Sequence, residues 1–190
     1  MSRALPWVGL AALLVLAGAL WVVREARQRA LERSIELVGI VCQPRGKVGK
    51  PLPVEFRLRN GGSEPAWVVT GDAECGGGFQ VRVYDSKGVD RRNDAVGCGM
   101  RAFVERDNFI ELRPGGSTAP LRDKFSRWWT PRAPGRYTVS ARYNYRPADL
   151  DFRWVPFRDL SEELSESLHP LVRRTFRLQR TIQVVVEVDP

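Results

Sequence analysis

The chain has 190 residues, enough for one domain with a hydrophobic core once an apolar N-terminal segment is set aside, and too few for two such domains. Its composition, 43% hydrophobic and 27% charged, is that of a globular chain and argues against intrinsic disorder. The formal net charge is +8, but the arginines are dispersed. This pattern predicts a solvated basic surface and argues against a dedicated nucleic-acid site.

The first predicted element is an apolar helix over residues 6–23, which contains no charged residue and carries Trp7 and Trp21 near its ends. Tryptophan favours membrane interfaces and the run has bilayer-spanning length, so we predict a transmembrane anchor. Helix formers continue beyond it, so residues 1–33 are predicted to form the anchor and a juxtamembrane stalk. A cleavable signal, cut after Ala19, is the alternative, and the domain would then be secreted.

The charges around the apolar run predict one orientation in the membrane. The run is preceded by Arg3 and the terminal amine, whereas four arginines follow it in the stalk. By the positive-inside tendency, this asymmetry places the globular part, residues 34–190, in the cytoplasm as a module of a membrane complex.

The cysteines predict the opposite side. Cys75 and Cys98 each lie among glycines, on either side of a strand-like segment, so the chain could turn back and join their sulfur atoms in a disulfide. Such a bond persists in an oxidising compartment, which favours an extracytoplasmic, periplasmic domain; three free thiols in a cytosolic chain are the alternative. Cys42, in an apolar run, is predicted to be a small buried hydrophobe.

Past Ser34 the hydrophobic period becomes that of strands, and turn-forming Asn-Gly and Pro-Gly sequences separate the segments. Short strands without long helices between them favour an antiparallel β-sandwich. The predicted strands cover residues 35–42, 53–60, 66–70, 79–85, 109–116, 125–130, 136–145 and 175–188.

Residues 146–174 differ from the strands on either side and are predicted to form a partly helical insertion. Leu160, Leu164 and Leu168 recur at four-residue spacing before Pro170, which predicts a short amphipathic helix. Long insertions in small β domains often carry function, and a lid over one end of the core is the alternative.

Residues 133–145 carry the pattern Pro-Gly-x-Tyr-x-Val-x-Ala, in which a turn feeds a strand that begins with Tyr137. This resembles the penultimate strand of immunoglobulin-like sandwiches, where a tyrosine hydrogen-bonds to backbone at the corner between the sheets. The strand, Asn-Gly turn and strand over residues 53–69, and the Leu-x-Pro-Gly-x-Ser sequence at 112–117, are similar to bacterial CARDB-like and BsuPI-type proteinase-inhibitor modules. The resemblance covers residues 47–145 and implies an immunoglobulin-like β-sandwich.

The BsuPI-type resemblance also implies proteinase inhibition as an alternative function. The N-terminal apolar segment, the Cys75–Cys98 pair and the insertion at 146–174 depart from those modules, and no inhibitory residue is carried over from them.

The residue pattern contains no convincing catalytic, metal or cofactor site. His169 is the single histidine and lies far from the cysteines, and no pair of cysteines has the Cys-x-x-Cys spacing of a metal site. The paired carboxylates of Asp149 and Asp151 lie in loop-like sequence, where solvation explains them. We therefore expect a protein without catalytic activity, cofactor or metal.

Aromatic residues and arginines of the C-terminal half supply the candidate contact surface. Trp128 and Trp129 are adjacent on a predicted strand, so they point to opposite faces and only one enters the core. The other, with Arg153, Trp154 and Phe157 of the insertion, predicts a contact patch for a protein partner or an envelope polymer. Packing of the second tryptophan beneath the insertion is the alternative.

Overall fold

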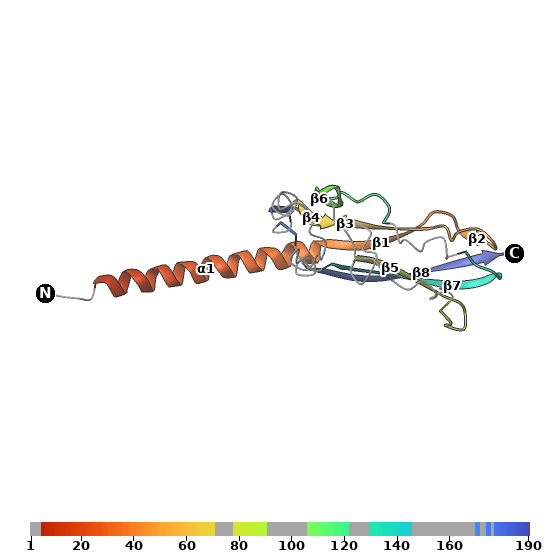
Figure 1. The fold of residues 1–190 in the computed structure, drawn as a ribbon, viewed down its shortest axis with the longest axis horizontal. Helices are drawn as coiled ribbons and strands as arrows, with labels where there is room; N and C mark the ends of the chain where they lie inside the picture. The colour runs from red at the N-terminus through yellow and green to blue at the C-terminus, as the bar shows by residue number, and fades with distance from the viewer. Residues whose placement is uncertain are drawn as a thin grey trace, which may run out of the picture.

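The computed structural model of the chain describes residues 5–70, 78–90, 106–121, 130–145, 170–171, 174–175 and 177–190. A long helix, α1 (Leu5–Ser34), projects from one end of a mainly β body, as Figure 1 shows. The chain passes from Ser34 at the end of α1 directly into the first strand at Ile35.

Three sheets are formed by the described strands, and all but one of their pairings are antiparallel. The first sheet pairs β1 (Ile35–Val41) with β3 (Val54–Asn60), and the second pairs β4 (Ala66–Val69) with β6 (Phe109–Leu112), which follows the short 3-10 helix η1 (Arg106–Asn108). The third has the order β2 (Arg45–Lys47), β8 (Leu178–Asp189), β7 (Gly135–Tyr145), β5 (Gly78–Tyr84), with β2 parallel to β8.

The strands lie in two layers with the hydrophobic core between them. In Figure 1, β1, β3, β4 and β6 lie on one side of the body and β5, β7 and β8 on the other. Alternate residues of β3 and of β7 are buried, as the sequence period predicts. The rings of Phe56 on β3 and Phe79 on β5 meet across the core, with their centroids 5.7 Å apart.

The first strands run beside the last one along the length of the body. Gly39 on β1 accommodates the side chain of Val184 on β8, where any side chain on residue 39 would clash. Further along, β2 pairs with the end of β8, and the amide of Val48 donates to the carbonyl of Asp189 at 3.1 Å. The N-terminal part of the domain is thus held by its C-terminal strand.

Most of the predicted strands are confirmed, and their order along the chain is that of β1, β3, β4, β5, β6, β7 and β8. The three-residue strand β2 was not predicted, because it is too short to show a period. The predicted strand at 125–130 and the leucine-rich helix of the insertion lie outside the described residues.

The predicted N-terminal helix is confirmed as a helix, and it continues without a break through the stalk to Ser34. The prediction of a transmembrane span at residues 6–23 needs correction, however. Within the portion of the chain that the structure describes, no helix combines the length and the apolar character needed to cross a membrane.

Candidate functional site

The residues of the predicted contact patch and of the predicted disulfide lie outside the described residues, so both remain predictions. They are Cys75, Cys98, Trp128, Trp129, Arg153, Trp154 and Phe157. The described residues instead bring together a different set, at the junction between α1 and the β body.

The prediction that Cys42 is buried is wrong, since its side chain is exposed. Cys42 lies one residue beyond β1, where the strand leaves the core, and its neighbours Ile40 and Val41 are 41% and 42% exposed. The Cys42 amide donates to the carbonyl of Pro53 at 2.8 Å, which holds the backbone beside β3 while the thiol faces outward.

Two tyrosines of β7 donate hydrogen bonds to backbone carbonyls, one near the start of the strand and one across the core. The hydroxyl of Tyr137 donates to the carbonyl of Ala133, four residues upstream, at 2.8 Å. The hydroxyl of Tyr143 crosses the core and donates to the carbonyl of Val69 on β4 at 2.5 Å. Burial raises the pKa of Tyr143 well above its usual range, so this side chain stays a neutral hydrogen-bond donor.

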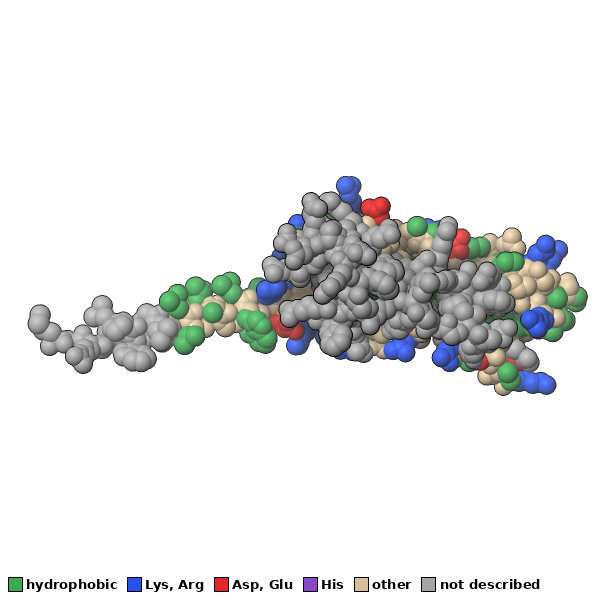
Figure 2. Space-filling model, viewed as in Figure 1, with side chains coloured by type: hydrophobic (Ala, Val, Ile, Leu, Met, Phe, Trp, Pro, Cys, Tyr) green, Lys and Arg blue, Asp and Glu red, His purple; other side chains and the backbone are tan. Residues whose placement is uncertain are grey.

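Residues 12–23, in the apolar part of α1, are all exposed. Because successive helical residues are about 100° apart, its consecutive apolar residues surround the whole helix and do not form a single stripe. Figure 2 shows hydrophobic side chains along this part of the helix, away from the β body. Each of the following is more than half exposed: Leu13, Leu14, Val15, Leu16, Leu20, Trp21, Val22 and Val23.

The stalk that follows, residues 24–34, is polar and touches the β body. Arg27 forms an ion pair with Glu64 in the turn after β3, with 2.6 Å between Nη2 and Oε2. Arg29 pairs with Glu25 one turn earlier on the helix, at 3.3 Å. Both pairs are exposed, so each contributes well under about 1 kcal/mol.

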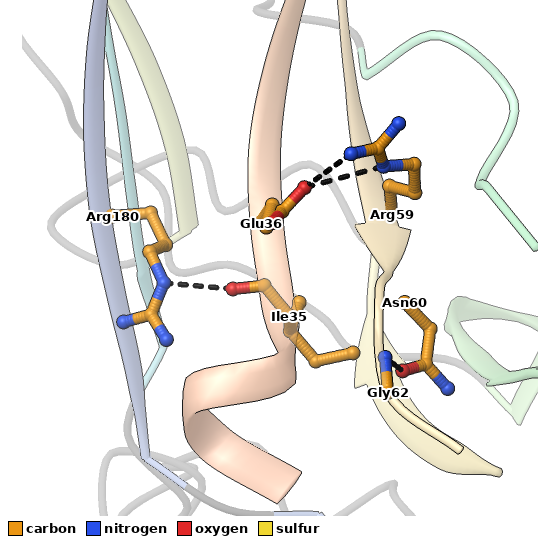
Figure 3. Close-up of polar contacts among 6 residues, drawn as sticks. All are labelled: Ile35, Glu36, Arg59, Asn60, Gly62 and Arg180. Carbon is orange, nitrogen blue, oxygen red and sulfur yellow. Dashed lines mark hydrogen bonds and ion pairs between the residues drawn. The ribbon is translucent and has the colours of Figure 1, made fainter. Parts of the chain in front are cut away.

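Arg180 of β8 binds the end of α1 from the opposite layer (Figure 3). Its Nε donates to the carbonyl of Ile35 at 2.7 Å, its Nη2 donates to the carbonyl of Glu32, and its Nη1 donates to the carbonyl of Gln179 at 2.8 Å. The last carbonyls of a helix lack partners within the helix and carry partial negative charge. The guanidinium supplies both the donors and the positive charge that they need.

Asn60, which is fully buried, joins the same junction to the turn after β3 and to β6. Its Nδ2 donates to the carbonyls of Glu64 at 2.8 Å and Leu112 at 2.9 Å, and its Oδ1 accepts from the amide of Gly62 at 2.9 Å. The hydroxyl of Ser34 lies 3.2 Å from the same oxygen. One buried amide group therefore connects three separate segments.

Ser34 completes the end of the helix. Its hydroxyl also lies 2.8 Å from the carbonyl of Leu31, and donates its one proton to this oxygen or to Asn60. The carbonyl of Ser34 accepts from the amide of Gly61 at 2.8 Å. A side chain on Gly62 would collide with Ser34, so glycine is required for this close approach.

The sequence analysis predicted no role for the two central junction residues, Arg180 and Asn60. Arg180 could have been found, because it is the one polar residue among the inward-facing residues of the last strand. Asn60 could be identified from the sequence only as a residue typical of turns. The residues that the structure describes include no cluster of three or more potential metal ligands, and the arrangement at the junction holds backbone in place.

Comparison with known proteins finds no matching family model, no matching curated protein and no matching solved structure.

Proposed function

We propose that this protein is a membrane-attached binding or assembly module without catalytic activity. The apolar part of α1 attaches it to lipid, and an immunoglobulin-like β-sandwich on the extracytoplasmic side contacts a protein partner or an envelope polymer. The observation that carries the proposal is the uncovered apolar helix beside a β body that buries its own core.

An apolar surface around a whole helix favours a non-aqueous environment. Fully burying one large aliphatic side chain is worth about 1.5–3 kcal/mol. For the more than half-exposed side chains between Leu13 and Val23, the gain on transfer to lipid is on the order of 10 kcal/mol. The exposed Arg24 follows directly after the apolar run, as expected for a helix that leaves lipid there.

Two features support the immunoglobulin-like assignment of the β body. The two layers pack around a common core, and the hydroxyl of Tyr137 bonds to backbone four residues upstream, at the start of β7. In immunoglobulin-like sandwiches, a tyrosine at the start of the penultimate strand makes this kind of bond. Such modules act through surface complementarity, which fits a binding role.

Membrane attachment can be tested with two double variants that add the same charge to α1. The apolar variant carries Leu16→Arg and Leu20→Arg, which place two positive charges in the apolar part of the helix. The stalk variant carries Gln28→Arg and Ala30→Arg, which place the same charge in the exposed stalk. The unaltered chain and the stalk variant should stay in the membrane pellet after washes with high salt and alkaline carbonate, and the apolar variant should appear in the supernatant. Release of the unaltered chain by salt alone would refute attachment through the apolar helix.

The side of the membrane is tested by counting thiols, after acid quench, on protein taken from its native membrane. A linked Cys75–Cys98 peptide with Cys42 free would support an extracytoplasmic domain. The alternative, a cytoplasmic module, is favoured by the four stalk arginines and predicts three free thiols per chain.

A further inference from the structure

We infer that α1 and the β body form one rigid unit, and that Arg180 is the positioning residue that sets the direction of the helix. The β body would then keep a fixed orientation and distance relative to the apolar part of α1, and would not swing on a flexible tether. That this fixes the domain above a membrane rests on the proposed function, whereas the rigidity is a property of the chain alone.

The junction contains no linker residues. Helical residues end at Ser34, and Ile35, which is fully buried, already belongs to β1. A flexible tether needs several residues with free backbone dihedrals and solvated backbone groups. Here the carbonyls of Glu32, Ser34 and Ile35 all accept hydrogen bonds from Arg180 or from the amide of Gly61.

Arg180, on β8 in the opposite layer, binds the backbone where α1 passes into β1. Its guanidinium is partly buried, and a desolvated cation is costly unless its donors are satisfied. Two of its three acceptors are the carbonyls of Glu32 and Ile35, which lie on the two sides of the helix-to-strand transition. A swing of α1 would carry the carbonyl of Glu32 away from the guanidinium, whereas the carbonyl of Ile35 stays on β1. The partly buried cation would then lose one of its acceptors, so the bond to Glu32 resists the motion.

A second set of contacts holds the junction from the other side. In Figure 3, Arg180 and Asn60 lie on opposite sides of the chain at Ile35. Asn60 and Gly61 bind Ser34 at the end of the helix, and Glu64 pairs with Arg27 two turns earlier. Contacts on two sides restrict bending in both directions.

The geometry gives this rigid unit a defined reach. Residues 24–34 extend about 16 Å at 1.5 Å per helical residue, and the 12 residues of β8 extend about 40 Å. The far end of the body, where β2 and β8 meet, therefore lies on the order of 55 Å from the end of the apolar run. A partner bound there would be held at that height.

The test is a distance measurement between spin labels on the full-length chain. Labels are attached to a ketone-bearing amino acid placed at the exposed positions Gln28 and Gln183, so that the natural cysteines stay unchanged. A single narrow distance distribution is expected. Arg180→Ala should at least double its width, Arg180→Lys should widen it because an ammonium cannot reproduce the guanidinium fork, and Arg177→Ala, an exposed arginine near the start of β8, should leave it unchanged.

Circular dichroism on each variant shows that the β body is still folded. A broad distribution in the unaltered chain would overturn the inference even if the Arg180 variants do not fold. An unchanged width in a folded Arg180→Ala or Arg180→Lys variant would remove Arg180 from the positioning role. A narrow distribution in a chain that does not bind membranes would refute only the proposed function, and a broad one in a membrane-bound chain would refute only this inference.

Discussion

Arg180 on the last strand donates a hydrogen bond to the carbonyl of Ile35, a residue 145 positions earlier in the chain, at 2.7 Å. This contact joins the two ends of the domain at the point where the helix enters it. It also explains why a cation lies among the otherwise apolar inward-facing residues of β8, because the carbonyls at the end of α1 need donors.

The close approach of β1 and β8 predicts that Gly39→Val destabilises the domain. The new side chain would clash with Val184, and overpacking of this kind costs about 1–3 kcal/mol. Urea unfolding followed by circular dichroism measures the loss. Gly18→Ala is the matched control, because a methyl group at that position meets no atom within 4 Å. Equal midpoints for the unaltered chain and Gly39→Val would contradict the packing described for this strand pair.

Asn60 is expected to be the most sensitive polar residue of the junction. Asn60→Ala removes the donors to the buried carbonyl of Leu112 and to Glu64, and an unsatisfied buried group costs about 1–3 kcal/mol. Asn60→Asp keeps the shape but also loses both donors, so it should be at least as destabilising. The exposed Gln179→Ala provides the comparison, with an expected change within about 0.5 kcal/mol. A stable Asn60→Asp variant would show that these bonds contribute little.

Tyr143 predicts a specific loss of stability in alkali. Its pKa is raised in the folded state by burial, so above about pH 10, where tyrosine ionises in the unfolded chain, only the unfolded state loses the proton. The free energy of unfolding then falls by about 1.4 kcal/mol per pH unit from this one group. Tyr143→Phe should remove that part of the pH dependence, whereas Tyr84→Phe, at a half-buried position on β5, should keep it. Identical slopes in both variants would contradict the prediction.

The exposed thiol of Cys42 should react rapidly with a maleimide in the native protein. Cys42→Ser should remove the rapid modification of the peptide that contains residue 42, and it should change the free energy of unfolding by less than about 0.5 kcal/mol, because the side chain is not part of the core. Mass spectrometry of the modified peptide identifies the site. Slow modification that requires denaturant would indicate a buried thiol and contradict the exposure seen here.

Local periodicity predicted most of the strands correctly, because a half-buried strand alternates apolar and polar residues whatever its neighbours are. Val54, Phe56 and Leu58 show this on β3, and each of them is buried. The same reasoning failed for Cys42, since an apolar run does not reveal where a strand leaves the core. It also missed β2, whose pairing depends on a partner at the other end of the domain.

The N-terminal helix, the strand-rich domain and the change of chain direction just before β7 were determined by the sequence alone, because each depends on residues close together in the chain. The roles of Arg180, Asn60 and Gly39 were decided only by the tertiary structure. Each of them contacts a residue far away in the sequence. Arg180 binds the end of α1, Asn60 binds β6, and Gly39 makes room for the side chain of Val184. Such contacts depend on which strands become neighbours, and that arrangement follows from packing of the whole core.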